Sequence, residues 1–184
     1  MQGKSYKADC TLPRENLRYI HVLHVGFDNQ VHEGELVVNK DIADDVLEIF
    51  KELYESGYQI EKVRLVDEYD ADDEASMSDN NSSAFNFRFI SHTTKISKHG
   101  MGMAVDINTL YNPYVKTVDG ELSIEPANAA DYVDRSNDFS HKIDMMIYAI
   151  SCLRSMVLSG EAIGRIPRII STLKNSADNF YGSI

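Results

Sequence analysis

The sequence predicts a single α+β domain, with a small antiparallel sheet and flanking helices. Stretches rich in β-branched residues, some alternating with polar residues, fill the centre of the chain. One amphipathic segment of helical period lies among them, and no repeat or low-complexity segment divides the chain. With 184 residues the chain can bury one core. We expect a polar arm at residues 1–16, the folded domain at 17–144 and an atypical tail at 145–184.

A β-hairpin is predicted directly after the arm. Its strands are Tyr19–Phe27 and Gly34–Asn39, and between them lie the turn-forming residues DNQ. His21 and His24 differ in parity along the first strand, so they are expected to face opposite sides of it. We therefore interpret both histidines as strand residues and not as metal ligands.

A helix is predicted from Asp41 to about Ser56. Asp41 is a residue type that caps helix N-termini, and Gly57 is typical of the position after a helix end. Apolar residues recur between them at helical spacing and predict one buried face, formed by Ile42, Val46, Ile49, Phe50 and Leu53.

The remaining elements are predicted to be strands and turns. Strands are expected at Ile60–Val66 and Ala84–Ile90, and a hairpin at Val115–Ile124 around Asp119-Gly120. The acidic run from Asp67 to Glu74 lacks the spacing and central glycine of a calcium-binding EF-hand loop. We interpret it as a solvated turn that leads into a helix.

Composition excludes several classes of partner. The formal net charge of −11 argues against nucleic acid and anionic membrane surfaces as partners, because both require exposed Lys and Arg. No apolar run approaches the ~20 residues of a membrane span, and no signal peptide is visible after Met1. Cys10 and Cys152 form no disulfide framework and no metal pair, so they are interpreted as ordinary thiols. The oligomeric state stays open.

The segment SKHGMGMAVDIN, residues 97–108, carries the strongest functional signal. It places His99 and Asp106 seven residues apart, and imidazole nitrogen and carboxylate oxygen are both good zinc ligands. Gly100 and Gly102 allow the backbone to bend tightly after the histidine. The following alternation predicts a strand in which Asp106 points away from the apolar face. The alternative is a polar loop whose histidine and aspartate only bond locally.

The wording of this segment resembles a known signature, S-x-H-x-x-G-x-A-x-D. That signature belongs to the zinc D-alanyl-D-alanine carboxypeptidases and L-alanyl-D-glutamate endopeptidases (VanY-like peptidoglycan peptidases). The resemblance extends through Ile60–Arg88 and Ile107–Val115, and covers the chain from about Leu17 to Asp144. The residues that match the signature position for position are Ser97, His99, Gly102, Ala104 and Asp106.

The resemblance implies a hedgehog-like fold and a bacterial hydrolase that binds one zinc ion. Its substrate would be a peptidoglycan stem peptide or a similar D-amino-acid peptide, and its expected location is the cell envelope or outside the cell. With no signal peptide visible, a cytoplasmic location or a trimmed chain stays open. His99 and Asp106 would bind zinc together with a later histidine. An acidic residue three positions before that histidine would activate the attacking water. Arg88, or alternatively Arg64, would hold a substrate carboxylate, and Ser97 would also contact substrate.

The chain departs from this family at its C-terminus. Family members end in a segment like W-G-G-D-W followed by D-Y-Q-H-F-E, which supplies the general base and the third zinc ligand. This chain has no tryptophan and no such segment. Its one histidine after Asp106 is His141, with Asp138 three residues before it, and this pair is a weak substitute for the missing residues.

A one-base shift of the reading frame recovers the missing segments. With suitable third bases, codons for Ser159–Gly164 shifted by one base encode E-W-G-G-D-W. Codons for Arg168–Asn175 shifted in the same way encode K-D-Y-Q-H-F-E-K, and a stop codon follows. The shifted aspartate codon overlaps that of Ile169, and the shifted histidine codon overlaps that of Thr172. We infer a one-base deletion after Asp144, which makes residues 145–184 an out-of-frame, helix-prone tail.

Two functions follow as expectations. The first is a zinc metallopeptidase of the cell-wall peptide-cleaving type, impaired in this chain because the third ligand and the general base are lost. The second is a non-catalytic descendant of the same fold that binds a peptidoglycan peptide or a metal ion. The C-terminal sequence discriminates between them.

Overall fold

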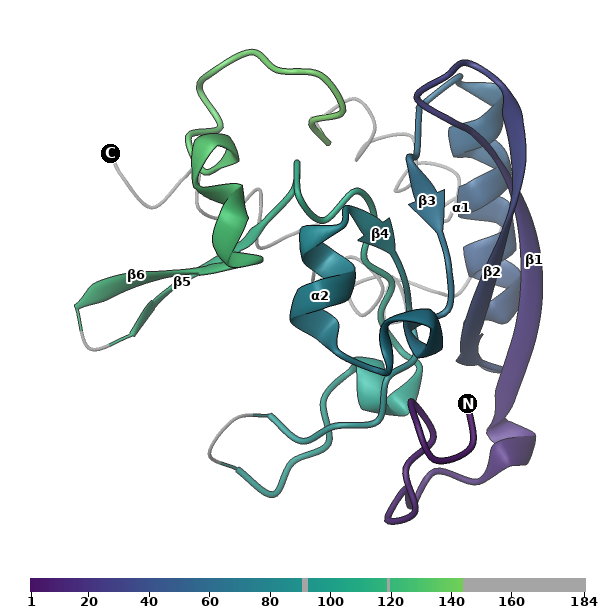
Figure 1. The fold of residues 1–184 in the computed structure, drawn as a ribbon. Helices are drawn as coiled ribbons and strands as arrows, with labels where there is room; N and C mark the ends of the chain where they lie inside the picture. The colour runs from purple at the N-terminus through teal and green to yellow at the C-terminus, as the bar shows by residue number, and fades with distance from the viewer. Residues whose placement is uncertain (91–92, 119, 144–184) are drawn as a thin grey trace, which may run out of the picture.

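The computed structural model describes residues 1–90, 93–118 and 120–143 (Figure 1). These residues mix helix and strand, compatible with the predicted α+β class. In place of the expected single antiparallel sheet, the described residues form three separate two-stranded sheets, of which one is parallel. The elements are β1 (Leu17–Val25), β2 (Val31–Asn39), α1 (Ala43–Glu55), β3 (Lys62–Val63), α2 (Asp73–Ser78), β4 (Asn81–Ser82), β5 (Tyr114–Val118) and β6 (Glu121–Glu125), with 3-10 helices η1 (Arg14–Asn16), η2 (Val66–Tyr69), η3 (His99–Met101) and η4 (Ala127–Tyr132).

The predicted first hairpin is confirmed. Strands β1 and β2 pair antiparallel along their whole length, from Leu17 opposite Asn39 to Val25 opposite Val31. The predicted parity of the two histidines is also confirmed, since His24 is buried and His21 is exposed. Alternate residues of β1 therefore face the core, as period-two alternation requires.

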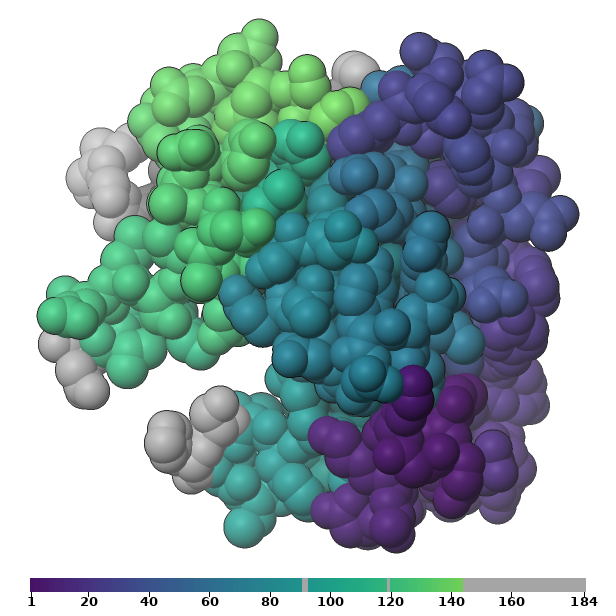
Figure 2. Space-filling view, viewed as in Figure 1, coloured from purple at the N-terminus to yellow at the C-terminus, as the bar shows by residue number. Residues whose placement is uncertain are grey.

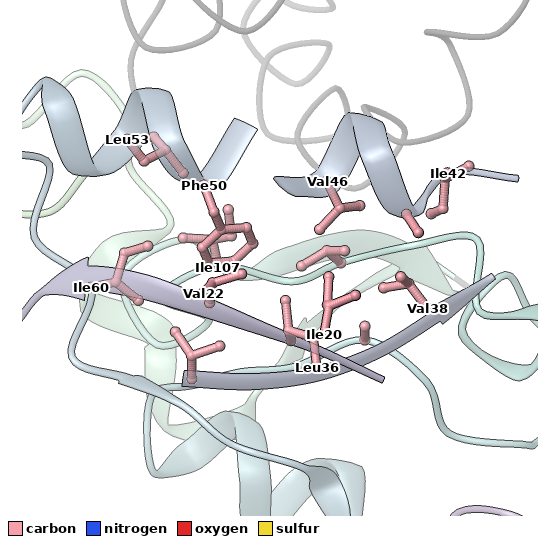
Figure 3. Close-up of a cluster of buried hydrophobic side chains, with 14 residues drawn as sticks. Ile20, Val22, Leu36, Val38, Ile42, Val46, Phe50, Leu53, Ile60 and Ile107 are labelled. Atoms are coloured by element: carbon pink, nitrogen blue, oxygen red, sulfur yellow. The ribbon is translucent and has the colours of Figure 1, made fainter. Parts of the chain in front are cut away.

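Helix α1 packs on one face of this hairpin and forms the main hydrophobic core (Figure 3). The predicted apolar stripe is confirmed, with Ile49 only partly buried and the others buried. The predicted cap is wrong: the N-cap residue is Ile42, and no side chain caps the helix. Ile42 is drawn into the core, which places the first turn one residue later. Gly57 ends the helix with φ of 70°, as predicted.

The two predicted central strands are largely absent. Within Ile60–Val66 only β3 is a strand, and it pairs parallel with β4. Residues 84–90 form no strand, because their amides bond to three different segments instead of one neighbouring strand. Phe85 N donates to Val37 O (3.1 Å), Asn86 N to His99 O (3.2 Å) and Phe87 N to Ser5 O (2.9 Å). The segment therefore connects β2, η3 and the N-terminal residues by hydrogen bonds.

The N-terminal residues lie against the body of the domain. Ser5 is buried, and its hydroxyl donates to Asp67 Oδ2 at 2.6 Å. The acidic run forms η2 and the start of α2, which confirms the predicted turn and helix, and Asp72 caps α2 by accepting from Ala75 N. Asp67 and Asp73 differ from the expected solvated run, because both bind other side chains of the domain.

The predicted second hairpin is confirmed as β5 paired with β6, and it projects from the domain (Figure 1). The predicted tail at residues 145–184, with Cys152, lies outside the described residues. Among the described helices, none is long and apolar enough to cross a membrane.

Shortening a buried side chain of α1 should show how much its packing on the β1–β2 hairpin contributes to the free energy of unfolding. Phe50 is 2% exposed, so we expect Phe50→Ala to lower the free energy of unfolding by about 3–5 kcal/mol through lost contacts and a residual cavity. Leu47 lies on the same helix and is 39% exposed, so Leu47→Ala serves as the control with a much smaller loss. Equal losses in chemical denaturation would contradict this packing.

Stability should fall as the pH drops through the range where histidine titrates. Burial lowers the pKa of His24 below its usual value, so the unfolded chain binds more protons than the folded chain there. Stability is therefore present at pH 7.5 and partly lost at pH 5.5. We expect His24→Gln to flatten this dependence in urea titrations, whereas His21→Gln on the exposed face should leave its slope unchanged.

Candidate metal-binding site

His99 and Asp106 converge, as the signature requires. The Nε2 atom of His99 lies 3.3 Å from Oδ2 of Asp106, and both side chains are mostly buried. The other ring nitrogen, Nδ1, lies 2.7 Å from the carbonyl oxygen of Ala84. Because a carbonyl only accepts, Nδ1 carries a proton, and Nε2 is the ring nitrogen directed at Asp106. This is the arrangement that orients a metal-binding histidine.

Backbone pairing positions the aspartate. Asp106 forms an isolated antiparallel bridge with Ser83, in which Asp106 N donates to Ser83 O (2.9 Å) and Ser83 N donates to Asp106 O (3.1 Å). The predicted strand is thus reduced to one bridge, but its alternation holds, because Val105 and Ile107 enter the core. Asp106 is directed the other way, toward His99.

The Asp106 carboxylate has an incomplete set of partners. Its Oδ1 atom is buried and has no hydrogen-bond partner among the described residues. Burial raises the pKa of Asp106, and the charge of a protonated His99 opposes that rise. A buried carboxylate oxygen without a donor is unfavourable unless a proton or a cation approaches it. The pair therefore fits a cation.

Two glycines of the motif allow close packing that a side chain would prevent. Gly102 has φ of 67°, and an added Cβ would lie 2.8 Å from Asn39 N. An added Cβ at Gly100 would lie 2.9 Å from the carbonyl oxygen of Arg88. The motif is therefore held between the end of β2 and the segment that carries Arg88.

Arg88 lies beside the pair, and Arg64 does not. Arg88 Nε forms an ion pair with Asp73, and the charge of Arg88 acts on Asp106 to lower its pKa. Asp73 also accepts a hydrogen bond from Asn86 Nδ2 (2.6 Å). Arg64 pairs with Glu68 next to it in η2 (3.3 Å) and is more than half exposed. The sequence interpretation missed Asp73, because the acidic run was taken as solvent-facing.

Ser97 is directed into its own loop. It is 5% exposed, and its Oγ accepts a hydrogen bond from Gly100 N at 2.9 Å. Its backbone N–H donates to Arg88 O (2.9 Å), so Ser97 joins η3 to the arginine segment. Its expected contact with substrate stays a prediction.

Asp138 and His141 lie elsewhere. The His141 ring stacks on Phe27 at the β1–β2 turn, with centroids 3.6 Å apart, and Asp138 lines a cavity of about 260 Å³ with it. Burial lowers the pKa of His141. In the part of the chain that the structure describes, no group of three His, Cys, Asp or Glu side chains could hold a metal ion. The structure therefore brings together His99 and Asp106, and does not bring His141 to them.

Ser97 should stabilise the loop that carries His99. We expect Ser97→Ala to lower the free energy of unfolding by about 0.5–1.5 kcal/mol, because the buried Gly100 amide loses its acceptor. Ser136, an exposed serine, supplies Ser136→Ala as the control for a lost surface hydroxyl. A Ser97→Ala chain as stable as the control in thermal unfolding would contradict this role.

Comparison with known proteins adds one finding. A family model described as D-alanyl-D-alanine carboxypeptidase matches residues 91–162, a range that includes His99 and Asp106. Neither a curated protein nor a solved structure matches the chain. The match agrees with the resemblance in the signature and with the convergence of its histidine and aspartate. The matched segment is thus similar to the D-alanyl-D-alanine carboxypeptidase family, and the match spans less than half of the chain.

Proposed function

We propose that this protein is a zinc peptidase-like protein of the D-alanyl-D-alanine carboxypeptidase type. Its substrate would be the stem peptide of bacterial peptidoglycan or a similar D-amino-acid peptide. The convergence of His99 Nε2 and Asp106 Oδ2 at 3.3 Å, with Asp106 Oδ1 unpaired, is the observation that carries the proposal. The family match over the same residues supports it.

Zinc held by His99 and Asp106 would polarise the scissile carbonyl and lower the pKa of an attacking water toward ~7. The remaining roles fall to the chain itself. Arg88 carries a guanidinium that can bind a substrate carboxylate in bidentate fashion, as a D-Ala terminus presents. Asp73 holds that guanidinium through the ion pair at Nε, which leaves its terminal nitrogens for substrate. In this proposal His99 and Asp106 would orient the scissile peptide bond through the metal ion, and Arg88 would anchor the peptide by its carboxylate.

We further propose that this exact chain is impaired. A catalytic zinc typically has three protein ligands, and the described residues supply two. The one-base deletion after Asp144 accounts for the missing histidine and general base, since both reappear in the shifted frame. The family match continues past Asp144 to residue 162, which is the result expected of an in-frame tail and not of an out-of-frame one. The nucleotide sequence across the Asp144 codon decides between an in-frame and an out-of-frame tail.

A non-catalytic role is the second candidate. Arg88 and its partner Asp73 both precede Asp144 in the sequence, so a chain with an altered tail keeps them and could still bind a peptide carboxylate without hydrolysis. The proposal also includes a VanY-like branch of the family, a hedgehog-like arrangement of the complete domain and a location at the cell envelope or outside the cell. These rest on the family resemblance.

Zinc binding and hydrolysis should both recover when the reading frame is restored. We expect this chain to bind zinc at least about tenfold to hundredfold more weakly than a chain from a gene with one base inserted after the Asp144 codon. Replacing a residue that only hydrogen-bonds to a metal ligand typically lowers metal affinity by that factor, and this chain lacks a direct ligand. Competition with a chelating dye measures the affinity. Release of D-Ala from a peptide ending in D-Ala-D-Ala measures activity.

Matched variants separate the possible outcomes. In the restored chain, His99→Ala should abolish zinc binding, whereas His21→Ala on the exposed face of β1 should not. If the chain as it stands releases D-Ala as fast as the restored chain, impairment is refuted, and Asp138 and His141 become the residues to replace. If neither chain binds zinc, the metallopeptidase proposal fails.

A further inference from the structure

The segment that carries Arg88 bonds to the loop that carries His99 through every second residue. His99 Nδ1 donates to Ala84 O at 2.7 Å, and Asn86 N donates to His99 O at 3.2 Å. Ser97 N donates to Arg88 O at 2.9 Å. Direct bonds therefore fix the backbone of Asn86 and Arg88 relative to His99.

The side chains of this segment alternate between the core and the site. Phe85 and Phe87 are buried in one hydrophobic cluster. Asn86 and Arg88 alternate with them, and both reach the same partner, Asp73 at the start of α2. Figure 2 shows that the segment borders an open notch, with the β5–β6 hairpin on its far side. The Arg88 side chain is 39% exposed, so a ligand can reach it.

Each oxygen of the Asp73 carboxylate has its own partner. Asn86 Nδ2 donates to Oδ1 at 2.6 Å, and Arg88 Nε forms its ion pair with Oδ2. A carboxylate bonded at both oxygens cannot rotate freely, so it fixes the direction in which Arg88 presents Nε. Asn86 therefore acts on Arg88 through Asp73.

Asn86 Nδ2 also bonds to a strained turn before α2. It donates to Ala71 O at 3.0 Å, and both of its partners are acceptors, so the nitrogen and not Oδ1 faces them. Asp70 and Ala71 have φ of 54° and 62°, the left-handed region that is unfavourable for residues with a Cβ. Strained residues persist where the surrounding structure fixes them, and they cluster at functional sites. Asn86, which is 3% exposed, thus holds both this turn and the carboxylate that follows it.

We propose that Asn86 is a positioning residue of the candidate site, which fixes Asp73 and, through Asp73, the guanidinium of Arg88. Its role toward substrate rests on the proposed function, in which Arg88 anchors the peptide carboxylate. Asn86 itself does not touch substrate. Its backbone N–H holds the loop of His99 while its side chain directs Arg88, so one residue couples the metal-binding pair to the anchor.

Hydrogen exchange of the Arg88 Nε–H group measures this positioning without any ligand. Nε is buried beside Asp73, so its NMR signal in the isotope-labelled full chain should exchange slowly, and Arg88→Lys identifies the signal by removing it. We expect Asn86→Ala to speed this exchange about tenfold, because Asp73 loses a charge-assisted hydrogen bond. Asp73→Asn should have a similar effect, and the double variant should add little to either single change, because both act on the same contact.

Asn81→Ala is the matched control. Asn81 is also buried, and its Nδ2 also donates two bonds, to Arg64 O (3.0 Å) and Ser76 Oγ (2.9 Å), away from Asp73. This variant should lower stability without faster exchange at Arg88, and backbone amides of the core in the same spectra correct for global unfolding. Exchange at Arg88 that stays slow in Asn86→Ala, or rises equally in Asn81→Ala, overturns the proposal. Where Asn86→Ala does not fold, Asn86→Ser, which keeps one donor, takes its place with a smaller expected rise.

Peptide binding tests the role toward substrate. Acetyl-D-Ala-D-Ala and its C-terminal amide differ by the carboxylate, and calorimetry with the full chain measures both without hydrolysis. We expect the unchanged chain to prefer the acid about tenfold, the size of a charge-assisted hydrogen bond. Asn86→Ala should lose most of this preference and Asn81→Ala should keep it, because a ratio of two affinities does not depend on the folded fraction.

The outcomes separate this inference from the proposed function. A preference for the acid that persists in Asn86→Ala overturns the inference and leaves the proposed function intact. Equal binding of both peptides by the unchanged chain refutes the role of Arg88 in the proposed function, and the role of Asn86 toward substrate with it. Binding of neither peptide refutes both in the same way, even where Asn86→Ala speeds exchange at Arg88.

Discussion

Asn39 joins the hydrophobic core to the candidate site. It is the last residue of β2, and its backbone N–H donates to Gly102 O at 2.8 Å. Its side-chain amide donates to Met101 O at 3.1 Å, and the residue is 8% exposed. The loop that carries His99 is therefore bonded to the same hairpin on which α1 packs. A catalytic or binding loop attached in this way inherits the rigidity of the core beneath it.

The electrostatics of the site follow from burial. Asp106 is enclosed, so its charged form is disfavoured, while Arg88 nearby favours it and Asp73 and Glu125 oppose it. Zinc ligands must be deprotonated, so a cation at this position would compete with protons for Asp106. Arg88 offsets negative charge at Asp73 and Asp106. In the proposed function its guanidinium would also bind a substrate anion.

Much of the candidate site could be predicted before any coordinates. The spacing of His99 and Asp106, the glycines between them and the alternation after them all concern residues close in sequence, where local geometry decides the outcome. The same holds for the β1–β2 and β5–β6 hairpins and for the apolar stripe of α1. The predicted N-cap at Asp41 is wrong because Ile42 is buried in the core and is itself the N-cap residue of α1, without a capping side chain. The predicted strand at residues 84–90 is wrong because the hydrogen-bond partners of this segment come from three distant segments.

The sequence by itself determined the residue types that carry the chemistry and the local elements that hold them, because periodicity and turn residues act over a few positions. Tertiary structure alone decided which arginine lies near the candidate pair His99 and Asp106, since Arg88 pairs with Asp73 and Arg64 stays with its neighbour Glu68. It also decided that His141 stacks on Phe27 away from His99. These outcomes depend on which distant surfaces pack together, and that packing is set by the burial of the whole core and by no single pattern in the chain.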